Sequence, residues 1–223
     1  EKVVVRASTQ TPFGTQDGIA RELGLGLEKV RVIPPFLGGG FGGKSAFRQA
    51  VEAARLAKLT GKPIMVHWTR KEEFFYDTFR PAAVVKVTSG ADKSGKIAMW
   101  DYNEYFAGSR GSDTVYDVPN AKTTSYSAQN VHPFGTGAWR APGNNTNTFA
   151  RESQIDMMAA KLGVDPLDFR LKNLKDERMI GVLKAVADMV GWTPAKSPSG
   201  RGYGIACGFD AGAYVAHIAE VKV

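Results

Sequence analysis

The feature that most constrains this chain is a glycine-rich run from Gly38 to Ser45 with the sequence GGGFGGKS. Five of its first six residues are glycine, so the main chain there carries almost no side chain. Glycine reaches positive φ at little steric cost and lets N–H groups come close to a ligand. The run lies between a strand-like segment at 29–33 and a helix-like segment at 46–59. Free N–H groups before a helix bind phosphate or another anion, so the run predicts a ligand-binding loop.

The same residues also satisfy the G-x-x-x-x-G-K-[ST] pattern of nucleotide-binding loops. That loop follows its strand directly, whereas residues 34–37 (PPFL) separate strand from glycines here. A nucleotide-binding loop usually has a partner carboxylate at the end of a second strand, which holds Mg²⁺. The candidate here is Asp101, but it begins a segment of alternating residues that predicts a continuing strand. The pattern alone does not decide between the two kinds of ligand.

Composition narrows the class of protein. The chain has 223 residues, 43% of them hydrophobic and 23% charged, which is ordinary for one large or two small globular domains. The net charge of +7 favours anionic ligands, but the sequence has no block of consecutive Lys and Arg that would indicate nucleic acid. Cys207 is the only cysteine, which excludes an internal disulfide and a cysteine-ligated iron–sulfur cluster. No apolar run reaches 18 residues, so no membrane span is expected.

Periodicity predicts an α+β fold, with helices packed on mixed, twisted sheets. Strands are expected at 3–5, 29–33, 64–66, 82–87, 96–106 and 122–127, with a final pair opened by 200–204, and long helices at 46–59, 147–162 and 179–190. We expect two subdomains that meet near residues 110–135. The chain begins at Glu1 without Met and ends at Val223 inside a strand-like pattern, so we also expect a piece of a longer polypeptide.

Two further residues carry possible chemistry. Gln10 follows the first strand, where a side chain points at whatever lies above the sheet, although an ordinary surface glutamine fits as well. Arg140 stands between Trp139 and a Pro–Gly turn, and its planar fork of donors suits phosphate or an oxo group; a packing arginine paired with a carboxylate is the alternative. His132 has no partner at metal-ligand spacing, so no metal ligand is predicted.

Taken together, these segments resemble a known family: the molybdopterin-binding large subunit of the xanthine dehydrogenase/aldehyde oxidase family of molybdenum hydroxylases. The Arg-Ala-Pro-Gly version of one motif is similar to the bacterial aldehyde, isoquinoline and nicotinate dehydrogenases. The segments that carry the resemblance, in family-like order and spacing, are 8–10 (STQ), 38–44 (GGGFGGK), 69–73 (TRKEE), 137–143 (GAWRAPG) and 165–173 (DPLDFRLKN).

The resemblance implies that the chain holds part of a molybdenum–molybdopterin cofactor, in its cytosine dinucleotide form. In the family a glutamine amide donates to an oxo group of the cofactor, and Gln10 occupies that position. The metal is held by pterin sulfurs, so no protein ligand is expected, and the nucleotide-loop match becomes accidental. The cofactor-binding residues that follow from the resemblance are Gln10, Gly39, Gly40, Phe41, Gly42 and Arg140.

Departures from the family pattern limit the expected substrate. Animal xanthine enzymes carry Glu at the position of Ser45 and Phe at the position of Pro142, so xanthine is a poor expectation here. The resemblance implies oxidation of an aldehyde or an N-heteroaromatic carbon, with water as the oxygen source. The family's catalytic Glu lies in a later glycine-rich segment, beyond Val223, together with the second cofactor-binding half. No catalytic residue is therefore assigned in this chain.

The resemblance also implies partners. The electrons removed from the substrate would pass to an iron–sulfur subunit and then to a subunit with FAD or haem, because this chain lacks the cysteines and the dinucleotide fingerprint for such carriers. We expect a bacterial enzyme, cytoplasmic or periplasmic, and we expect this chain alone to be inactive. We also expect self-association or strand exchange through residues 203–223.

Overall fold

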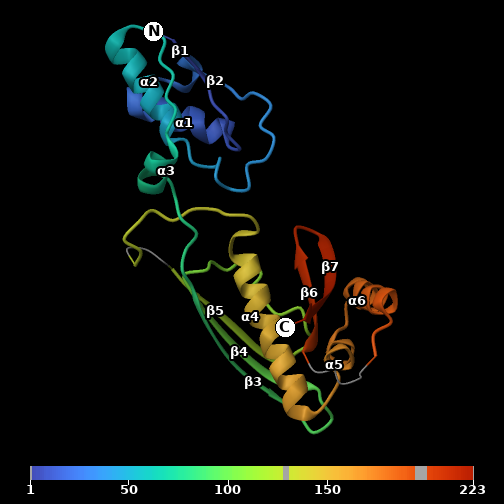
Figure 1. Cartoon of the computed structure of the whole chain (residues 1–223). Coiled ribbons are helices and arrows are strands. Elements are labelled where there is room, and N and C mark those ends of the chain that lie inside the picture. The colour runs from blue at the N-terminus through green and yellow to red at the C-terminus, as the bar shows by residue number, and fades with distance from the viewer. Residues whose placement is uncertain (1, 128–130, 194–199, 223) are drawn as a thin grey trace. The chain divides into compact units, whose positions relative to one another are not determined.

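The computed structural model describes residues 2–127, 131–193 and 200–222, and it divides into two units (Figure 1). The first unit comprises Glu1–Pro81 and Asn130–Ala141, and the second comprises Ala82–Gln129 and Pro142–Val223. The chain therefore passes between the units three times, after residues 81, 129 and 141. The crossing after residue 129 falls within the expected boundary at 110–135. Residues 128–130, close to that crossing, and Val223 lie outside the described residues.

The first unit is built on a strand–helix–strand arrangement. Strand β1 (Val3–Arg6) pairs in parallel with β2 (Val30–Ile33), and helix α1 (Pro12–Leu23) connects them. The other elements of this unit are η1 (Leu27–Lys29), α2 (Arg48–Thr60) and α3 (Arg70–Tyr76). A parallel pair needs such a crossover because its strands enter the sheet from the same end.

Local signals set the ends of these helices. Pro12 opens α1, where its missing N–H costs nothing, and Gly24 ends it at a φ of 66°. Helix α3 begins with a capping box in which Thr69 and Glu72 accept each other's main-chain N–H. The helices bury small and branched side chains against the strands; the core of the unit is Val5, Ile19, Ala20, Leu23, Val30, Ala50 and Ala54.

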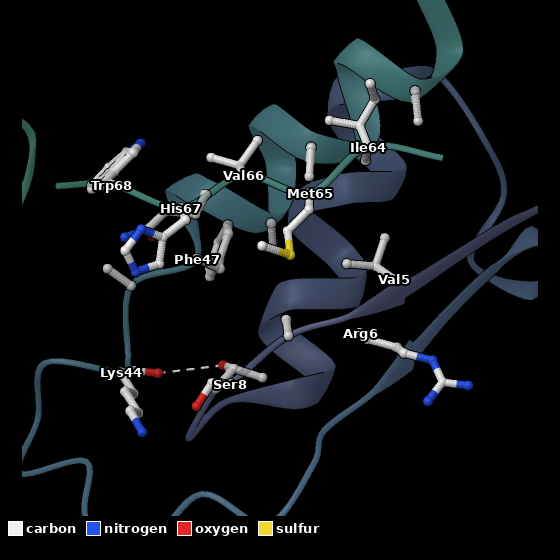
Figure 2. A pocket seen from close by; sticks show the side chains of 18 of the residues that line it. Val5, Arg6, Ser8, Lys44, Phe47, Ile64, Met65, Val66, His67 and Trp68 are labelled. Atoms are coloured by element: carbon white, nitrogen blue, oxygen red, sulfur yellow. Dashed lines mark hydrogen bonds between the residues drawn. The ribbon is translucent and has the colours of Figure 1, made fainter. Parts of the chain in front are cut away.

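The expected strand at 64–66 is not formed. Residues 63–69 are extended but have no strand partner in the part of the chain that the structure describes. A groove of about 900 Å³ lies between this segment, α2 and the outer edge of β1. Figure 2 shows Ile64, Met65 and Val66 on the segment and Val5 on the strand. Met65 is 89% exposed. This apolar residue of the pattern that predicted a strand is therefore not covered by a neighbouring element.

The second unit contains a mixed sheet of β3 (Val84–Ala91), β4 (Ile97–Tyr105) and β5 (Asn120–Tyr126), in that spatial order. Strands β3 and β4 are antiparallel, with a shift of register between Gly90 and Ala91, whereas β4 and β5 are parallel. The remaining elements are α4 (Pro142–Leu162), α5 (Pro166–Asn173), α6 (Glu177–Val190), and the antiparallel pair β6 (Arg201–Asp210) and β7 (Ala213–Lys222).

Helix α4 lies along the sheet of the second unit and joins it to the shorter elements (Figure 1). Fully buried side chains from the sheet and the helices, among them Trp100, Ile155, Phe169 and Leu183, form one continuous core. This arrangement of helices on mixed sheets confirms the expected α+β class. None of the helices in the described residues combines the length and the apolar character needed to cross a bilayer.

Helix α4 begins at Pro142, five residues before the expected start at 147, although its first turns are rich in Asn and Thr. Asn147 explains this difference. Its Nδ2 donates to the carbonyls of Gly108 (2.9 Å) and Arg110 (3.0 Å), and its Oδ1 accepts from the Tyr102 hydroxyl (2.9 Å). These contacts with a loop and the sheet stabilise a helical start that local propensity disfavours.

Candidate functional site

The glycine-rich loop presents bare main chain to solvent. Phe41 and Gly42 have φ values of 52° and 95°, and the loop is closed by bonds from Gly43 N to Gly40 O (2.9 Å) and from Ser45 N to Gly42 O (3.1 Å). The N–H groups of Gly39, Gly40 and Phe41 have no hydrogen-bond partner among the described residues. Three consecutive free donors are therefore available to one acceptor-rich ligand.

Neighbouring segments approach this loop so closely that side chains are excluded. A Cβ on Gly40 would lie 2.4 Å from the Gln10 side chain, and one on Gly42 would lie 2.5 Å from the Ala138 carbonyl oxygen. Contacts under 3.0 Å do not occur for real Cβ atoms, and the Ala138 oxygen is main chain that cannot rotate away. The loop thus needs glycine for packing at Gly42 as well as for its conformation.

Gln10 lies against the loop. Its main-chain N–H donates to Lys44 O (2.8 Å), and its side-chain Oε1 accepts from Gly42 N (3.1 Å). Because an N–H group can only donate, this bond fixes the orientation of the amide: the oxygen faces Gly42 and the NH₂ end is left as a donor. Gln10 is exposed, so that donor end is accessible to a ligand.

Arg140 lies over the Phe41 ring of the loop. Its guanidinium carbon lies 4.3 Å from the centre of the Phe41 ring, a cation–π contact, and both side chains are exposed. The segment before it is held by bonds from Phe79 N to Gly135 O and from Gly137 N to Phe79 O, both 2.9 Å. All six sequence-predicted residues are thus brought together within the first unit.

Lys44 has a different setting from the lysine of a nucleotide-binding loop. Its Nζ donates to Leu37 O at the start of the loop (2.9 Å), and α2 begins only at Arg48. In a nucleotide-binding loop the lysine reaches the phosphates and stands where the helix opens. The geometry therefore gives the nucleotide alternative no support. In the described segments no three His, Cys, Asp or Glu side chains come together as a metal site.

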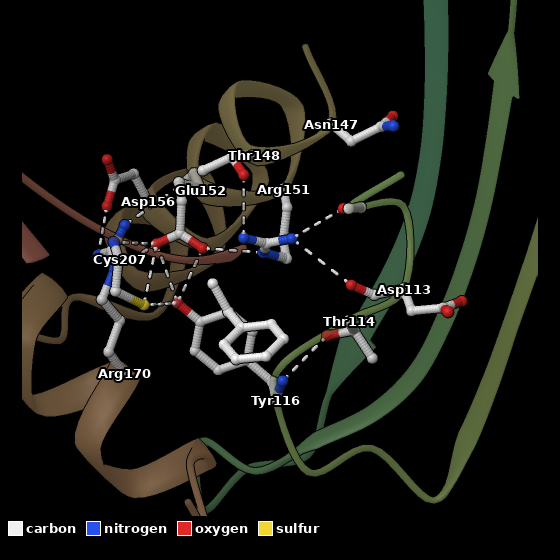
Figure 3. A network of polar contacts seen from close by, with 12 residues as sticks. Asp113, Thr114, Tyr116, Asn147, Thr148, Arg151, Glu152, Asp156, Arg170 and Cys207 are labelled. Carbon is white, nitrogen blue, oxygen red and sulfur yellow. Dashed lines mark hydrogen bonds and ion pairs between the residues drawn. The ribbon is translucent and has the colours of Figure 1, made fainter. Parts of the chain in front are cut away.

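A buried polar network in the second unit was not predicted from the sequence. Glu152 is 4% exposed and accepts from Arg151 Nε (3.1 Å), Arg170 Nε (3.0 Å) and the Tyr116 hydroxyl (3.0 Å) (Figure 3). It also accepts from Cys207 N at 3.1 Å. With its oxygens occupied by these donors, Glu152 is a structural carboxylate rather than a candidate base.

The segment 165–173 contributes to the same framework rather than to the candidate site. Asp165 caps α5, while Asn173 accepts from Ile97 N (2.9 Å) and donates to Gly95 O (3.0 Å), which joins the helix to the β3–β4 turn.

Burial, followed by the Glu152 charge, raises the pKa of Tyr116 well above its usual value. Burial and Glu152 also raise the pKa of the Cys207 thiol to about 12, so Cys207 is not a nucleophile at neutral pH.

Similarities to known proteins cover most of the chain. It matches the molybdopterin cofactor-binding domain family over residues 1–110 and 105–174. It is 31% identical to the aldehyde oxidoreductase molybdenum-binding subunit PaoC of Escherichia coli K12 over 93% of this chain and 32% of that protein. It is 28% identical to the isoquinoline 1-oxidoreductase subunit beta of Brevundimonas diminuta over 96% of this chain and 30% of that subunit.

A solved structure shares the fold. Quinoline 2-oxidoreductase from Pseudomonas putida 86 superposes with a TM-score of 0.78 at 18% identity, over 92% of this chain and 31% of that one. The chain thus spans 30–32% of the length of these three proteins. The similarities give the nucleotide-binding alternative no support either.

Proposed function

This chain belongs to the family of molybdopterin cofactor-binding domains, and we propose that it contributes one part of the cofactor site of a molybdenum hydroxylase large subunit. The residues proposed to contact the cofactor are Gln10, Gly39, Gly40, Phe41, Gly42 and Arg140. One observation carries the proposal. The glycine-rich loop has unpaired N–H groups at residues 39–41, and the NH₂ end of Gln10 supplies a further donor next to that loop.

The chemistry of these groups fits the proposed cofactor. Oxo and phosphate oxygens accept hydrogen bonds, and the loop offers main-chain donors from glycines, with the Phe41 ring lying beside Gly39. Arg140 adds a positive charge at the rim. When bound, the cofactor supplies the two-electron redox chemistry, while the residues of this chain bind and orient it. We propose the cytosine dinucleotide form.

The proposed substrate is an aldehyde or an N-heteroaromatic compound that is oxidised with water as the oxygen source. The names of two relatives, an aldehyde oxidoreductase and an isoquinoline oxidoreductase, support this class. Ser45 replaces the acidic residue that the resemblance places beside a purine. We assign no general base to this chain, since both buried carboxylates are already engaged. Glu152 accepts from Arg170 and Tyr116, and Glu104 accepts from Ala107 N, Gly108 N and the Ser125 hydroxyl.

We further propose that electrons leave through an iron–sulfur subunit and a subunit with FAD or haem. The lone cysteine, Cys207, is buried in the second core and cannot ligate such a cluster. On this proposal the complete enzyme turns over substrate and this chain alone does not.

The first test is the cofactor content of the full-length protein purified from its own source. We expect about one molybdenum and one pterin per chain, by elemental analysis and by fluorescence of the oxidised pterin. Full-length protein without molybdenum would contradict the proposal. Mg²⁺-dependent ATP binding that disappears in Lys44→Ala would support the nucleotide alternative instead.

The Gln10→Glu variant tests the donor end of the amide. A carboxylate oxygen can still accept from Gly42 N, but the ionised side chain has no N–H to donate. If the donor acts on charge that develops during the reaction, kcat should fall by roughly 10²-fold. The holoenzyme should keep its circular dichroism spectrum. A tenfold change in kcat corresponds to about 1.4 kcal/mol. If kcat of the variant stays within about threefold of the wild-type value, the donor is not needed for the reaction.

A further inference from the structure

We propose that the buried Thr9 hydroxyl is a positioning group that holds Gln10 in register with the glycine-rich loop. The inference deepens the proposed function and rests on it for the identity of what Gln10 and the loop hold. Gln10 is exposed, and the contacts of its side chain are with Gly40 and Gly42 of the loop, so its placement depends on how its segment is held against that loop.

Thr9 lies at a junction of three segments. Its side chain is buried, with 3% exposed, and its Oγ1 lies 3.0 Å from Thr15 Oγ1 on α1. The same oxygen accepts from Thr11 N (3.0 Å) and donates to Lys44 O (3.3 Å). One hydroxyl therefore contacts the segment that carries Gln10, the first helix and the end of the glycine-rich loop.

The hydrogen positions follow from the partners. The Thr15 hydroxyl donates to Thr11 O (2.9 Å), which uses its only hydrogen. Thr9 must then be the donor toward Thr15, and its hydrogen is shared between Thr15 Oγ1 and Lys44 O. A hydroxyl that accepts from one N–H and donates toward two oxygens satisfies this arrangement. A methyl group of the same size leaves Thr11 N without this acceptor and removes one donor each from Thr15 Oγ1 and Lys44 O.

The Thr9 contacts coincide with those that hold Gln10. Lys44 O accepts from Thr9 and also from Gln10 N (2.8 Å), and Thr11 Oγ1 donates to the next carbonyl, that of Ser45 (3.1 Å). The segment 9–11 is therefore bonded to consecutive carbonyls at the end of the loop. In this register Gly42 N donates to the Gln10 oxygen, which leaves the NH₂ end of the amide as the donor.

The test uses the full-length protein and three variants. Thr9→Val keeps the shape and removes the hydroxyl, while Thr9→Ser keeps the hydroxyl. Val30→Ala is the matched control, because Val30 is a buried residue of the same core and its truncation weakens the unit without changing a polar contact. Two readouts are measured at equal fractions folded: hydrogen exchange of peptides that cover 8–11 and 40–47, and molybdenum per chain after dialysis.

We expect Thr9→Val to speed exchange in both peptides and to weaken cofactor retention by roughly tenfold, the effect of leaving a buried hydrogen-bonding group unpaired. Thr9→Ser should restore both readouts, and Val30→Ala should change neither. If the wild-type protein holds molybdenum and Thr9→Val gives the same two readouts as Val30→Ala, the positioning role is overturned and the proposed function stands. If the wild-type protein holds no molybdenum, the proposed function fails and this inference fails with it.

Discussion

Glu152 illustrates, at the scale of one residue, how an ionised side chain can remain in a protein core. It lies between two buried guanidinium groups, those of Arg151 and Arg170, and it accepts further bonds from Tyr116 and Cys207 N. Removing one partner of a buried ion pair leaves the other charge without compensation. The residue thus joins α4, α5 and β6 through hydrogen bonds rather than through apolar contact.

We predict that Glu152→Gln lowers the free energy of unfolding of the second unit by about 3–5 kcal/mol. Whichever way the new amide turns, its NH₂ group would face a donor, Arg151 Nε on one side or Arg170 Nε and Cys207 N on the other. Arg151 would lose its carboxylate partner, and Arg170 would keep only Asp156. Urea unfolding followed by circular dichroism measures the change. Glu22→Gln, at an exposed pair with Arg55, is the control and should change stability by less than about 1 kcal/mol.

Cys207 provides an independent measure of the same network. Its thiol is buried and its pKa is raised to about 12, so a thiol reagent should modify it slowly at pH 8 in the native protein and quickly in urea. Opening of the network in Glu152→Gln should speed this modification in the absence of denaturant. Equal rates in the variant and in the wild type would mean that Glu152 does not control access to the thiol.

At the scale of elements, helix α4 depends on contacts that a sequence window does not contain. Its first two turns carry Asn144, Asn145 and Asn147, residues that favour turns and caps over helix interiors. Asn144 Nδ2 donates to Phe209 O (3.1 Å), and Asn147 bonds to the loop at 108–110. Periodicity therefore predicted the apolar half of the helix, and the structure adds the polar half through tertiary hydrogen bonds.

We predict that Asn147→Ala destabilises the second unit by about 2 kcal/mol or more, since two carbonyls would lose their donor and the buried Tyr102 hydroxyl would keep only the longer bond to Asn147 O (3.3 Å). Asn145→Ala is the matched control: Asn145 is exposed on the same turn, and alanine there should be neutral or slightly stabilising. Thermal unfolding of both variants gives the comparison. A similar loss in both would assign the effect to the helix end rather than to the Asn147 contacts.

The segment 64–66 shows the opposite limit of sequence patterns. Two of its three residues, Ile64 and Val66, are branched and favour an extended conformation, which the main chain adopts (Figure 2). Strand formation also requires a neighbouring edge within hydrogen-bond distance. Such a neighbour is a non-local property. The pattern predicted the conformation correctly and the pairing wrongly, because β1 lies across a groove from the segment.

At the scale of the whole molecule, the candidate site was easier to predict than the framework that holds it. The glycine loop was found from residue types alone, because few other sequences allow such bare main chain. Gln10 and Arg140 were candidates from their context, but only the resemblance gave them a role, since a lone glutamine or arginine fits many surfaces. Thr9 lies in the segment 8–10 that carries the resemblance, but no role was assigned to it, because a threonine after a strand is common and its role depends on where Thr15 and Lys44 lie in space.

We also predict that this 223-residue chain self-associates through residues 203–222. Strands β6 and β7 pair only with each other in the described part of the chain, and Tyr203, Val215 and Val221 are each more than a third exposed. Exposed strand edges with apolar side chains favour pairing between copies. Light scattering should give a mass that rises with concentration, and Val221→Lys should reduce that rise. A single monomeric mass at every concentration would contradict this expectation.

The threefold passage of the chain between its units affects how the protein forms during translation. Domains generally fold as they leave the ribosome, N-terminal part first, at about 5–20 residues per second. The first unit, however, includes residues 130–141, which are made after the whole β3–β5 sheet. Gln10 and the glycine-rich loop are therefore synthesised well before Ala138 and Arg140, the residues that contact the loop. This chain's part of the proposed cofactor site can therefore form only after residue 141 has been synthesised.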